Sequence, residues 1–293
     1  MQPAFIFTRP QTPEQRAASI TEARELLANA ERVLIGAGAG LSTAAGHDYG
    51  GQRFKETFPA FIKNYGITDM YSGGFYPYPT EEEKWAYWAR QATVNCLGEN
   101  ALPLYRELFE WAKTRDYFVV TTNVDLQFEK AGFDPQRIFE PQGSFDTIQC
   151  STGEHGIKNA AELFAAIESD TNKGERTRIT DPSLVPVCEV CGSPMEMHLR
   201  VDGSFVQDDA WYAAQGRYER FVEEIPEKPT LLLELGVGWN TPVWIRMPFE
   251  TIARETGSPL VRMNYDEAAV DKSLPKAVAI EGDIAETFPA ITQ

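Results

Sequence analysis

The sequence has little positive charge, few cysteines and no long apolar run. Its 293 residues carry 27 Lys plus Arg against 43 Asp plus Glu, a formal net charge of −16. Nucleic-acid affinity comes mostly from cations that neutralise phosphates, so a nucleic-acid partner is disfavoured. No apolar stretch approaches the ~18 residues of a membrane span, and we expect no membrane partner.

Disulfide scaffolds and secretory signals are also disfavoured. Four cysteines in a chain of 293 residues are too few for a disulfide framework, which favours a reducing, cytoplasmic compartment. The N-terminus lacks a basic region followed by an apolar stretch, so we expect no secretory signal.

Short apolar runs do occur, and they alternate with stretches typical of helices. Buried strands are predicted at 32–35, 117–121, 230–235, 259–263 and 277–280. Helices are predicted at 12–30, 80–88, 104–113, 124–131 and 208–225. The first two begin with capping-box patterns, Thr12 with Gln15 and Thr80 with Glu83. This alternation predicts an α/β fold with a mostly parallel sheet and helices on both faces.

Residues 144–205 differ in amino-acid composition from the rest of the chain. They are polar, rich in turn residues, and contain Cys150, Cys188 and Cys191. A chain of this length can hold one large domain or a main domain with a smaller insertion. We interpret 144–205 as an inserted module.

A glycine-rich turn follows the first predicted strand. Gly36, Gly38 and Gly40 allow a tight turn and the close approach of a pyrophosphate, and a following helix would supply free N–H groups. The spacing differs from G-x-G-x-x-G, so a turn needed only for packing is the alternative. The strand before it and the helix after it favour nucleotide binding.

Four separated segments together resemble the sirtuin (Sir2) family of NAD-dependent enzymes. They are 36–49, 122–125, 142–143 and a carboxy-terminal group made of 236–238, Asn264 and 282–283. The resemblance covers about 31–288 and implies a Rossmann-like NAD-binding domain with a helical and a usually zinc-bearing insertion. We expect the NAD-binding domain at 1–50, 116–143 and 206–293, the helical insertion at 51–115, and the zinc-ribbon-like insertion at 144–205.

The resemblance also implies roles for individual residues. Asn123 and Asp125 would line the nicotinamide-ribose pocket, where oxygens stabilise the oxocarbenium character that develops as the nicotinamide–ribose bond breaks. Taken alone, Asn123 also fits a helix N-cap. The other implied NAD-binding residues are Gly36, Ala37, Gly38 and Ser42 at the phosphates, Asp48 at the nicotinamide carboxamide, Gly236, Val237, Gly238 and Asn264 at the adenosine, Asp283 and Ile284 at the adenine, and, without an assigned part of NAD, Tyr49, Arg53 and Gln142.

Two departures from the family pattern bear on the reaction. Gln142 stands where the family has a general-base histidine, and an amide cannot accept the proton. Deacylation is therefore disfavoured, whereas glycosidic cleavage and transfer of ADP-ribose stay open. Together with 46–54, Gln142 resembles the class M sirtuins, microbial protein ADP-ribosyltransferases associated with lipoylated carrier proteins. Gly50 replaces a usual arginine, for which Arg53 is a candidate substitute.

The cysteines predict a metal site with an unusual ligand set. Cys188 and Cys191 form a C-x-x-C pair, which is half of a zinc ribbon. Cys150 fits the first position of the second pair that the family needs, but Gly153 occupies the other position, and His155 would complete a set of three cysteines and one histidine. A hairpin that has lost its zinc is an equal alternative. Cys96 is expected to be a buried helix residue.

Three hypotheses of function follow. The first is an NAD-dependent protein mono-ADP-ribosyltransferase with Asn123, Asp125 and Gln142 as catalytic residues, a lipoyl-carrier protein as a candidate substrate and a macrodomain protein as a candidate partner. The second is an NAD-dependent protein deacylase that tolerates Gln142. The third is an NAD sensor or NAD glycohydrolase.

Overall fold

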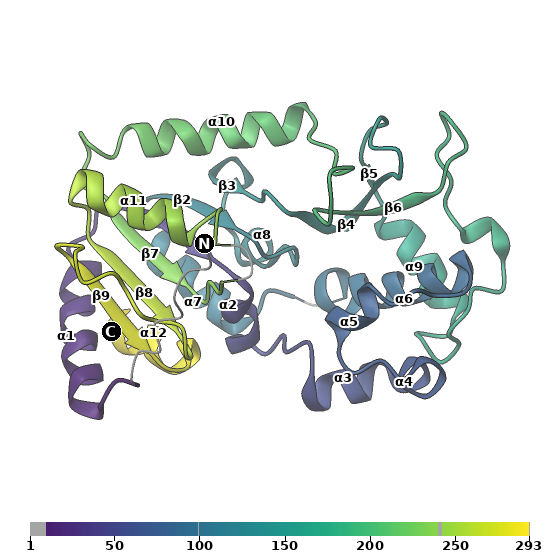
Figure 1. The fold of residues 1–293 in the computed structure, drawn as a ribbon, viewed down its shortest axis with the longest axis horizontal. Helices are drawn as coiled ribbons and strands as arrows, with labels where there is room; N and C mark the ends of the chain where they lie inside the picture. The colour runs from purple at the N-terminus through teal and green to yellow at the C-terminus, as the bar shows by residue number, and fades with distance from the viewer. Residues whose placement is uncertain (1–9, 99, 240–241, 293) are drawn as a thin grey trace, which may run out of the picture.

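The chain folds into two lobes of different architecture (Figure 1). The structure is a computed structural model that describes residues 10–98, 100–239 and 242–292. The larger lobe contains a six-stranded parallel sheet in the order β3-β2-β1-β7-β8-β9. Its strands are β1 Arg32–Ala37, β2 Asp116–Thr121, β3 Ile138–Phe139, β7 Leu231–Leu235, β8 Leu260–Asn264 and β9 Ala277–Glu281. The prediction of an α/β fold with a mostly parallel sheet is confirmed.

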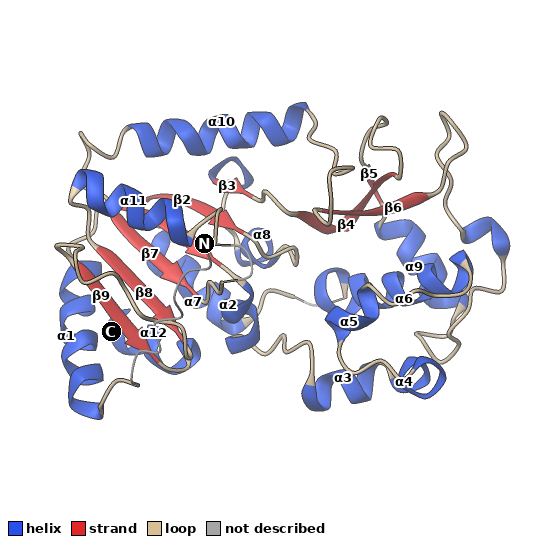
Figure 2. Cartoon of the chain, in the orientation of Figure 1, coloured by secondary structure: helices blue, strands red, loops and turns tan. Residues whose placement is uncertain are grey.

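Helices cover both faces of this sheet (Figure 2), as predicted. The helices α1 Pro13–Ala28, α7 Pro103–Ala112, α8 Gln127–Ala131 and α12 Ile284–Thr292 share a core with one face, and α10 Asp209–Glu223 and α11 Arg246–Thr256 share a core with the other. Successive strand residues point to opposite faces. Val33 and Ile35 of β1 accordingly join the first core, and Leu34 joins the second.

Local signals set where several helices begin. The Thr12 Oγ1 accepts from Gln15 N at 3.2 Å, and the Gln15 Oε1 accepts from Thr12 N at 3.0 Å, which is the predicted capping box of α1. The Asp208 carboxylate caps α10 by accepting from Trp211 N at 2.9 Å.

The predicted helix over 124–131 begins three residues late, at Gln127. Leu126 has a left-handed backbone with φ of 55°, which a right-handed helix cannot include. Val124 O accepts from Phe145 N at 2.9 Å, and Asp125 Oδ1 accepts from Gln127 N at 3.2 Å. Asn123 therefore lies in a loop after β2 and caps no helix at Val124, so that alternative was wrong.

The smaller lobe is built from two chain segments around one shared core. Its first segment holds α3 Gly51–Thr57, α4 Pro59–Tyr65, α5 Met70–Gly74, α6 Glu81–Ala92 and the π-helix η1 Thr93–Leu97. Its second segment holds the antiparallel sheet β5-β4-β6, formed by Lys158–Asn159, Gly143–Cys150 and Met195–Leu199, with α9 Ala161–Asp170. Trp85 of α6 stacks on Phe164 of α9, with ring centroids 6.3 Å apart. The two segments thus form one packed body.

The limits of the domains remain a proposal. Leu104 and Leu108 of α7 are buried in a core of the larger lobe, whereas Cys96 of η1 is buried in the core of the smaller lobe. We propose that the helical insertion ends between η1 and α7, before the limit at residue 115 that we expected from the sequence. Among the described residues, no helix combines the length and apolarity that a membrane crossing requires.

Candidate active site and metal centre

The candidate NAD-binding residues gather at one edge of the parallel sheet. Ala37, Asn123, Gly236, Asn264 and Asp283 lie at or just after the carboxyl ends of five parallel strands. The central strand β1 pairs with β2 on one side and with β7 on the other, so the strand order reverses there. Open α/β sheets bind their ligands at the carboxyl ends of strands beside such a reversal.

The glycine-rich turn after β1 is packed tightly against the end of β7. A Cβ atom on Gly38 would lie 2.8 Å from Gly236 O, which is too close for any side chain. Gly236 itself has φ of +63°, a left-handed conformation that favours glycine. Gly38 N donates to Leu235 O at 3.0 Å, and Gly40 N donates to Gly236 O at 2.9 Å. These glycines therefore have a packing role, and their predicted contact with phosphates stays a prediction.

Asn123 is the centre of a buried hydrogen-bond network. Its Nδ2 donates to Gly38 O at 3.0 Å, to Ser42 Oγ at 3.1 Å and to Tyr105 OH at 3.0 Å. The Ser42 Oγ donates to Asp125 Oδ2 at 2.6 Å and lies 2.7 Å from Tyr105 OH. The structure thus brings the predicted residues Asn123, Asp125 and Ser42 together in one cluster.

Burial dominates the electrostatics of this network. Asp125 is 5% exposed, and burial raises the pKa of its carboxyl although hydrogen bonds from Ser42 and Gln127 lower it. Burial, with the nearby charge of Asp125, also raises the pKa of Tyr49. A carboxylate that is buried away from water is suited to stabilise positive charge on a ligand, because fixed charges interact more strongly where water is excluded.

The segment after the glycine turn is tied to the smaller lobe by Arg53. Its Nη1 donates to Asn95 Oδ1 at 2.8 Å and to Asp48 O at 3.2 Å, and its Nη2 donates to Val94 O at 2.7 Å. Asp48 is exposed, and its Oδ1 accepts from Gly50 N at 2.9 Å. The Arg53 guanidinium therefore fixes the loop that carries Asp48. That Arg53 takes over the role of the family arginine replaced by Gly50 stays a prediction.

The residues predicted to hold adenosine connect the ends of β7, β8 and β9. Asn264 Nδ2 donates to Val237 O at 3.0 Å, and Asn264 O accepts from Gly282 N at 2.9 Å. Asp283 Oδ1 accepts from Ala285 N at 2.8 Å, and Ile284 is buried. They lie side by side at the sheet edge, as predicted, while their contact with NAD stays a prediction.

Gln142 follows, by two positions, Glu140, which is one of a pair of acidic residues that the sequence did not reveal. The Gln142 backbone O accepts from Arg200 N at 3.0 Å. The pKa of Glu140 is raised well above its ordinary value, mainly by burial and next by the nearby charge of Glu129. Burial also raises the pKa of Glu129. Burial and a neighbouring like charge both disfavour ionisation, so we expect the two carboxyls to share one proton in the folded state.

This pair gives a pH-dependent prediction for stability. Because the pKa of Glu140 is higher in the folded state, its contribution to stability is present at low pH and is lost as the pH rises toward the folded pKa. Glu140→Gln removes that loss, so the variant should melt a few degrees above the wild type at about pH 8 and no higher at about pH 4. Thermal unfolding at both pH values measures this.

Glu129→Gln is the matched variant, because it neutralises the other member of the same pair. If the two carboxyls share one proton, the double variant should gain little beyond either single variant. Melting curves of Glu140→Gln that parallel those of the wild type at every pH would contradict the shared proton.

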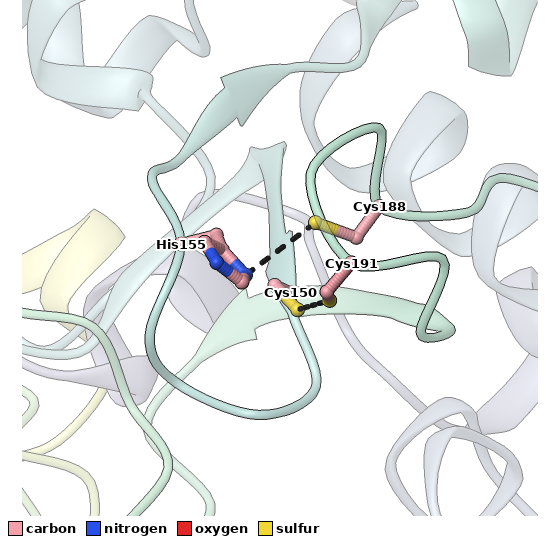
Figure 3. Close-up of side chains that lie close together, drawn as sticks. All are labelled: Cys150, His155, Cys188 and Cys191. Atoms are coloured by element: carbon pink, nitrogen blue, oxygen red, sulfur yellow. Dashed lines mark hydrogen bonds between the residues drawn. The ribbon is translucent and has the colours of Figure 1, made fainter.

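The four predicted metal ligands converge from three parts of the smaller lobe (Figure 3). Cys150 ends β4, His155 follows in the next loop, and Cys188 and Cys191 come from the turn before β6. Their ligand atoms all lie within 4.8 Å of one another. The structure therefore unites the complete predicted set.

The distances within this cluster suit a tetrahedral zinc ion. With Zn–S near 2.3 Å and Zn–N near 2.0 Å, tetrahedral angles place two sulfurs about 3.8 Å apart and a sulfur and a nitrogen about 3.5 Å apart. Cys150 Sγ lies 3.7 Å from Cys191 Sγ, and Cys188 Sγ lies 3.6 Å from His155 Nδ1. The sulfur pair is far longer than a disulfide bond of about 2.05 Å. Hydrogen bonds from Ser193 lower the pKa of Cys191 to about 6, which favours the thiolate that binds metal.

Cys96 is buried in η1, as predicted, and is not a member of this cluster. His47 is also buried, and its backbone N donates to Ser42 O at 2.8 Å, which places it beside the Asn123 network.

Tyr105 is the member of the Asn123 network that the sequence did not reveal. It belongs to α7, an amphipathic helix in which an aromatic residue at a buried position is ordinary core. Nothing in the sequence indicates that its hydroxyl reaches a loop eighteen positions later. Only the packing of α7 beside the end of β2 brings the two together.

Known proteins resemble this chain along most of its length. No family model matches it. A protein ADP-ribosyltransferase of Staphylococcus aureus is 31% identical over 255 residues, which cover 86% of this chain and 79% of that protein. A probable bifunctional ADP-ribose hydrolase/ADP-ribosyltransferase of Fusarium oxysporum f. sp. cubense is 31% identical over 94% of this chain, which spans about half (48%) of that protein. A solved complex of Sir2 with p53 peptide and NAD+ has the same fold, with a TM-score of 0.57, 17% identity, and coverage of 93% of this chain and 97% of that chain.

Proposed function

The chain belongs to the sirtuin (Sir2) family, in its protein ADP-ribosyltransferase type, and from this we propose that it transfers ADP-ribose from NAD to a protein. The observation that carries the proposal is the buried network of Asn123, Ser42 and Asp125 at the sheet reversal. NAD supplies an ADP-ribosyl group joined to nicotinamide as the leaving group.

The reaction needs stabilisation of positive charge on the ribose. The Asp125 carboxylate is buried and oriented by Ser42, and the Asn123 side chain is fixed by three acceptors. Preorganised oxygens of this kind stabilise an oxocarbenium-like transition state, because they need no rearrangement as charge develops. Asp48, on the loop fixed by Arg53, is our candidate for the nicotinamide carboxamide.

Gln142 favours transfer over deacylation. Deacylation in this family requires a general base after nicotinamide leaves, and an amide side chain has no suitable pKa. Gln142 can still donate and accept hydrogen bonds, so we assign it to hold the ribose. A nucleophile on the target protein would then attack the ribose carbon that nicotinamide leaves.

Several partners are part of this proposal. A lipoyl-carrier protein is the candidate substrate, because Gln142 and the segment 46–54 together resemble the class M sirtuins. A macrodomain protein is the candidate partner, and the name of the Fusarium relative, which joins an ADP-ribose hydrolase to a transferase, supports such a pairing. The four free cysteines, with no disulfide, support a cytoplasmic location.

Competing assays separate transfer from the alternatives. The protein is incubated with NAD labelled in its adenylate half and with lipoylated carrier, unlipoylated carrier or an acylated peptide. We expect label on the lipoylated carrier. An O-acyl-ADP-ribose product from the peptide would instead support the deacylase, and free ADP-ribose without any acceptor would support the glycohydrolase. Tight NAD binding without nicotinamide release would contradict all three enzymes and favour the sensor.

A further inference from the structure

Tyr105 places a buried hydroxyl among the polar groups of the candidate active site. The side chain is 0% exposed, and its OH lies 2.7 Å from Ser42 Oγ and 3.0 Å from Asn123 Nδ2. It comes from α7, which lies outside the four motif segments on which the sirtuin resemblance was based. Burial raises the pKa of Tyr105 well above its ordinary value, so the hydroxyl keeps its proton.

The chemistry of the neighbours fixes the direction of each hydrogen bond. An ionised carboxylate only accepts, so Ser42 must give its single proton to Asp125, 2.6 Å away. The Ser42 oxygen is then left as an acceptor, and Tyr105 must donate to it. The amide nitrogen of Asn123 only donates, and its two protons serve three acceptors, so at least one proton is shared while the Tyr105 oxygen accepts. The protons therefore point along one chain from Asn123 through Tyr105 and Ser42 to Asp125.

This chain determines which way the Asn123 amide faces. Its nitrogen has three protein acceptors on one side, namely Gly38 O, Ser42 Oγ and Tyr105 OH. A flipped amide would place Oδ1 against the Gly38 carbonyl, where two acceptors would repel each other. The nitrogen thus faces the protein, and Oδ1 is presented on the opposite side.

We propose that Tyr105 is a positioning residue for nicotinamide cleavage, which holds the Asn123 amide in one orientation and directs the Ser42 proton to Asp125. This inference rests on the proposed function, because it assigns Asn123 and Asp125 to that reaction. The hydroxyl acts through its neighbours and is not itself placed at the reacting bond. Linked hydrogen bonds polarise one another, so the loss of one donor weakens the bonds at both ends.

The aromatic ring of Tyr105 has a separate packing role. It meets Phe128 edge to face with ring centroids 5.1 Å apart, and it lies in the core that covers one face of the parallel sheet. Phenylalanine would keep this ring contact and remove only the hydroxyl. Tyr105→Phe therefore separates positioning from packing.

Tyr117→Phe is the matched control. Tyr117 belongs to the same core, is 7% exposed, and accepts from Asp134 N at 2.9 Å, a contact outside the Asn123 network. Both variants remove one buried tyrosine hydroxyl. They differ in whether that hydroxyl touches the candidate active site.

The test measures nicotinamide release from NAD by wild type and both variants. We expect Tyr105→Phe to lower kcat about tenfold or more, with KM for NAD within about twofold, because the groups that act in the transition state are misaligned. Tyr117→Phe should keep the wild-type kcat. In a Ser42→Ala background the chain is already broken, so Tyr105→Phe should then cost much less. Equal kcat for Tyr105→Phe and Tyr117→Phe would overturn the proposal.

The pH profile gives a readout that loss of packing would not move. Tyr105→Phe weakens the bond from Ser42 to Asp125, which stabilises the ionised carboxylate. The acid limb of kcat should therefore move to higher pH in this variant, and it should stay in place in Tyr117→Phe.

A spectroscopic measurement keeps this inference separate from the proposed function. The side-chain amide signals of Asn123, identified by their loss in Asn123→Ala, are recorded by nitrogen-15 NMR. Tyr105→Phe should shift these signals and hasten their exchange with water, whether or not the wild type releases nicotinamide. Unchanged signals would refute the positioning role. Absence of nicotinamide release by the wild type would refute the proposed function instead.

Discussion

Asn123→Ala is expected to abolish measurable release of nicotinamide from NAD while the protein stays folded. The substitution removes the amide at the centre of the buried network, whose nitrogen donates to Gly38 O, Ser42 Oγ and Tyr105 OH. Loss of one preorganised group in an active site typically lowers kcat by about 10²–10³-fold. Because buried hydrogen bonds contribute about 1 kcal/mol each, the variant should be less stable but still folded. Nicotinamide release and thermal unfolding measure the two effects.

Asn29→Ala provides the control for this experiment. Asn29 closes α1, where its Nδ2 donates to Glu25 O at 2.7 Å, far from the carboxyl ends of the strands. It should keep wild-type turnover. If Asn123→Ala also keeps full turnover, the assignment of the catalytic site is wrong, because no other described amide occupies that network.

Removal of the metal ligands is expected to have the largest effect on stability. Cys188→Ser, or treatment with a strong chelator, should release bound zinc and lower the melting temperature by many degrees. Binding of structural zinc contributes about 10–16 kcal/mol in small zinc fingers. The loss should be smaller here, because Cys150 and Cys188 also lie in a hydrophobic core that persists without the ion. Metal analysis and thermal unfolding test this prediction.

Cys96→Ala is the matched cysteine variant. Cys96 is buried in η1, and burial raises the pKa of its thiol, which disfavours the thiolate form that binds metal. This variant should keep a full complement of zinc, even if its core is weakened. A wild-type protein that contains no zinc after purification in zinc-supplemented medium would contradict the site and favour a hairpin that has lost its metal.

The sequence was sufficient where local chemistry decides the structure. The capping patterns at Thr12 and Thr80 located two helices, and five apolar runs located five of the six parallel strands. The sixth strand, β3, has two residues and no pattern of its own, so only its pairing with β2 reveals it. Helix α9 was not predicted, because it lies within a polar stretch of the sequence. Its buried side chains pack on α6 and not on the main sheet.

Only the site residues that lie at the ends of parallel strands could be predicted from the sequence. Asn123, Asn264 and Gly236 follow apolar runs, and parallel strands present such residues at one edge. Tyr105 and Glu140 could not be found in this way. Tyr105 reaches the site through packing of helix on sheet, and the pKa of Glu140 depends on burial beside Glu129. The error at Val124 had a similar origin, since its pairing with Phe145 of β4 draws that residue away from the helix.

Transfer of ADP-ribose to a protein is tested most directly by one ratio. It divides the amount of ADP-ribose attached to protein by the amount of nicotinamide released. Both quantities are measured in one reaction of the enzyme with NAD and lipoylated carrier, by intact-mass spectrometry and by chromatography. The absence of a general base at Gln142 and the intact Asn123 network predict a ratio near unity. Release of nicotinamide with unmodified carrier, or formation of O-acyl-ADP-ribose in its place, would contradict protein ADP-ribosylation.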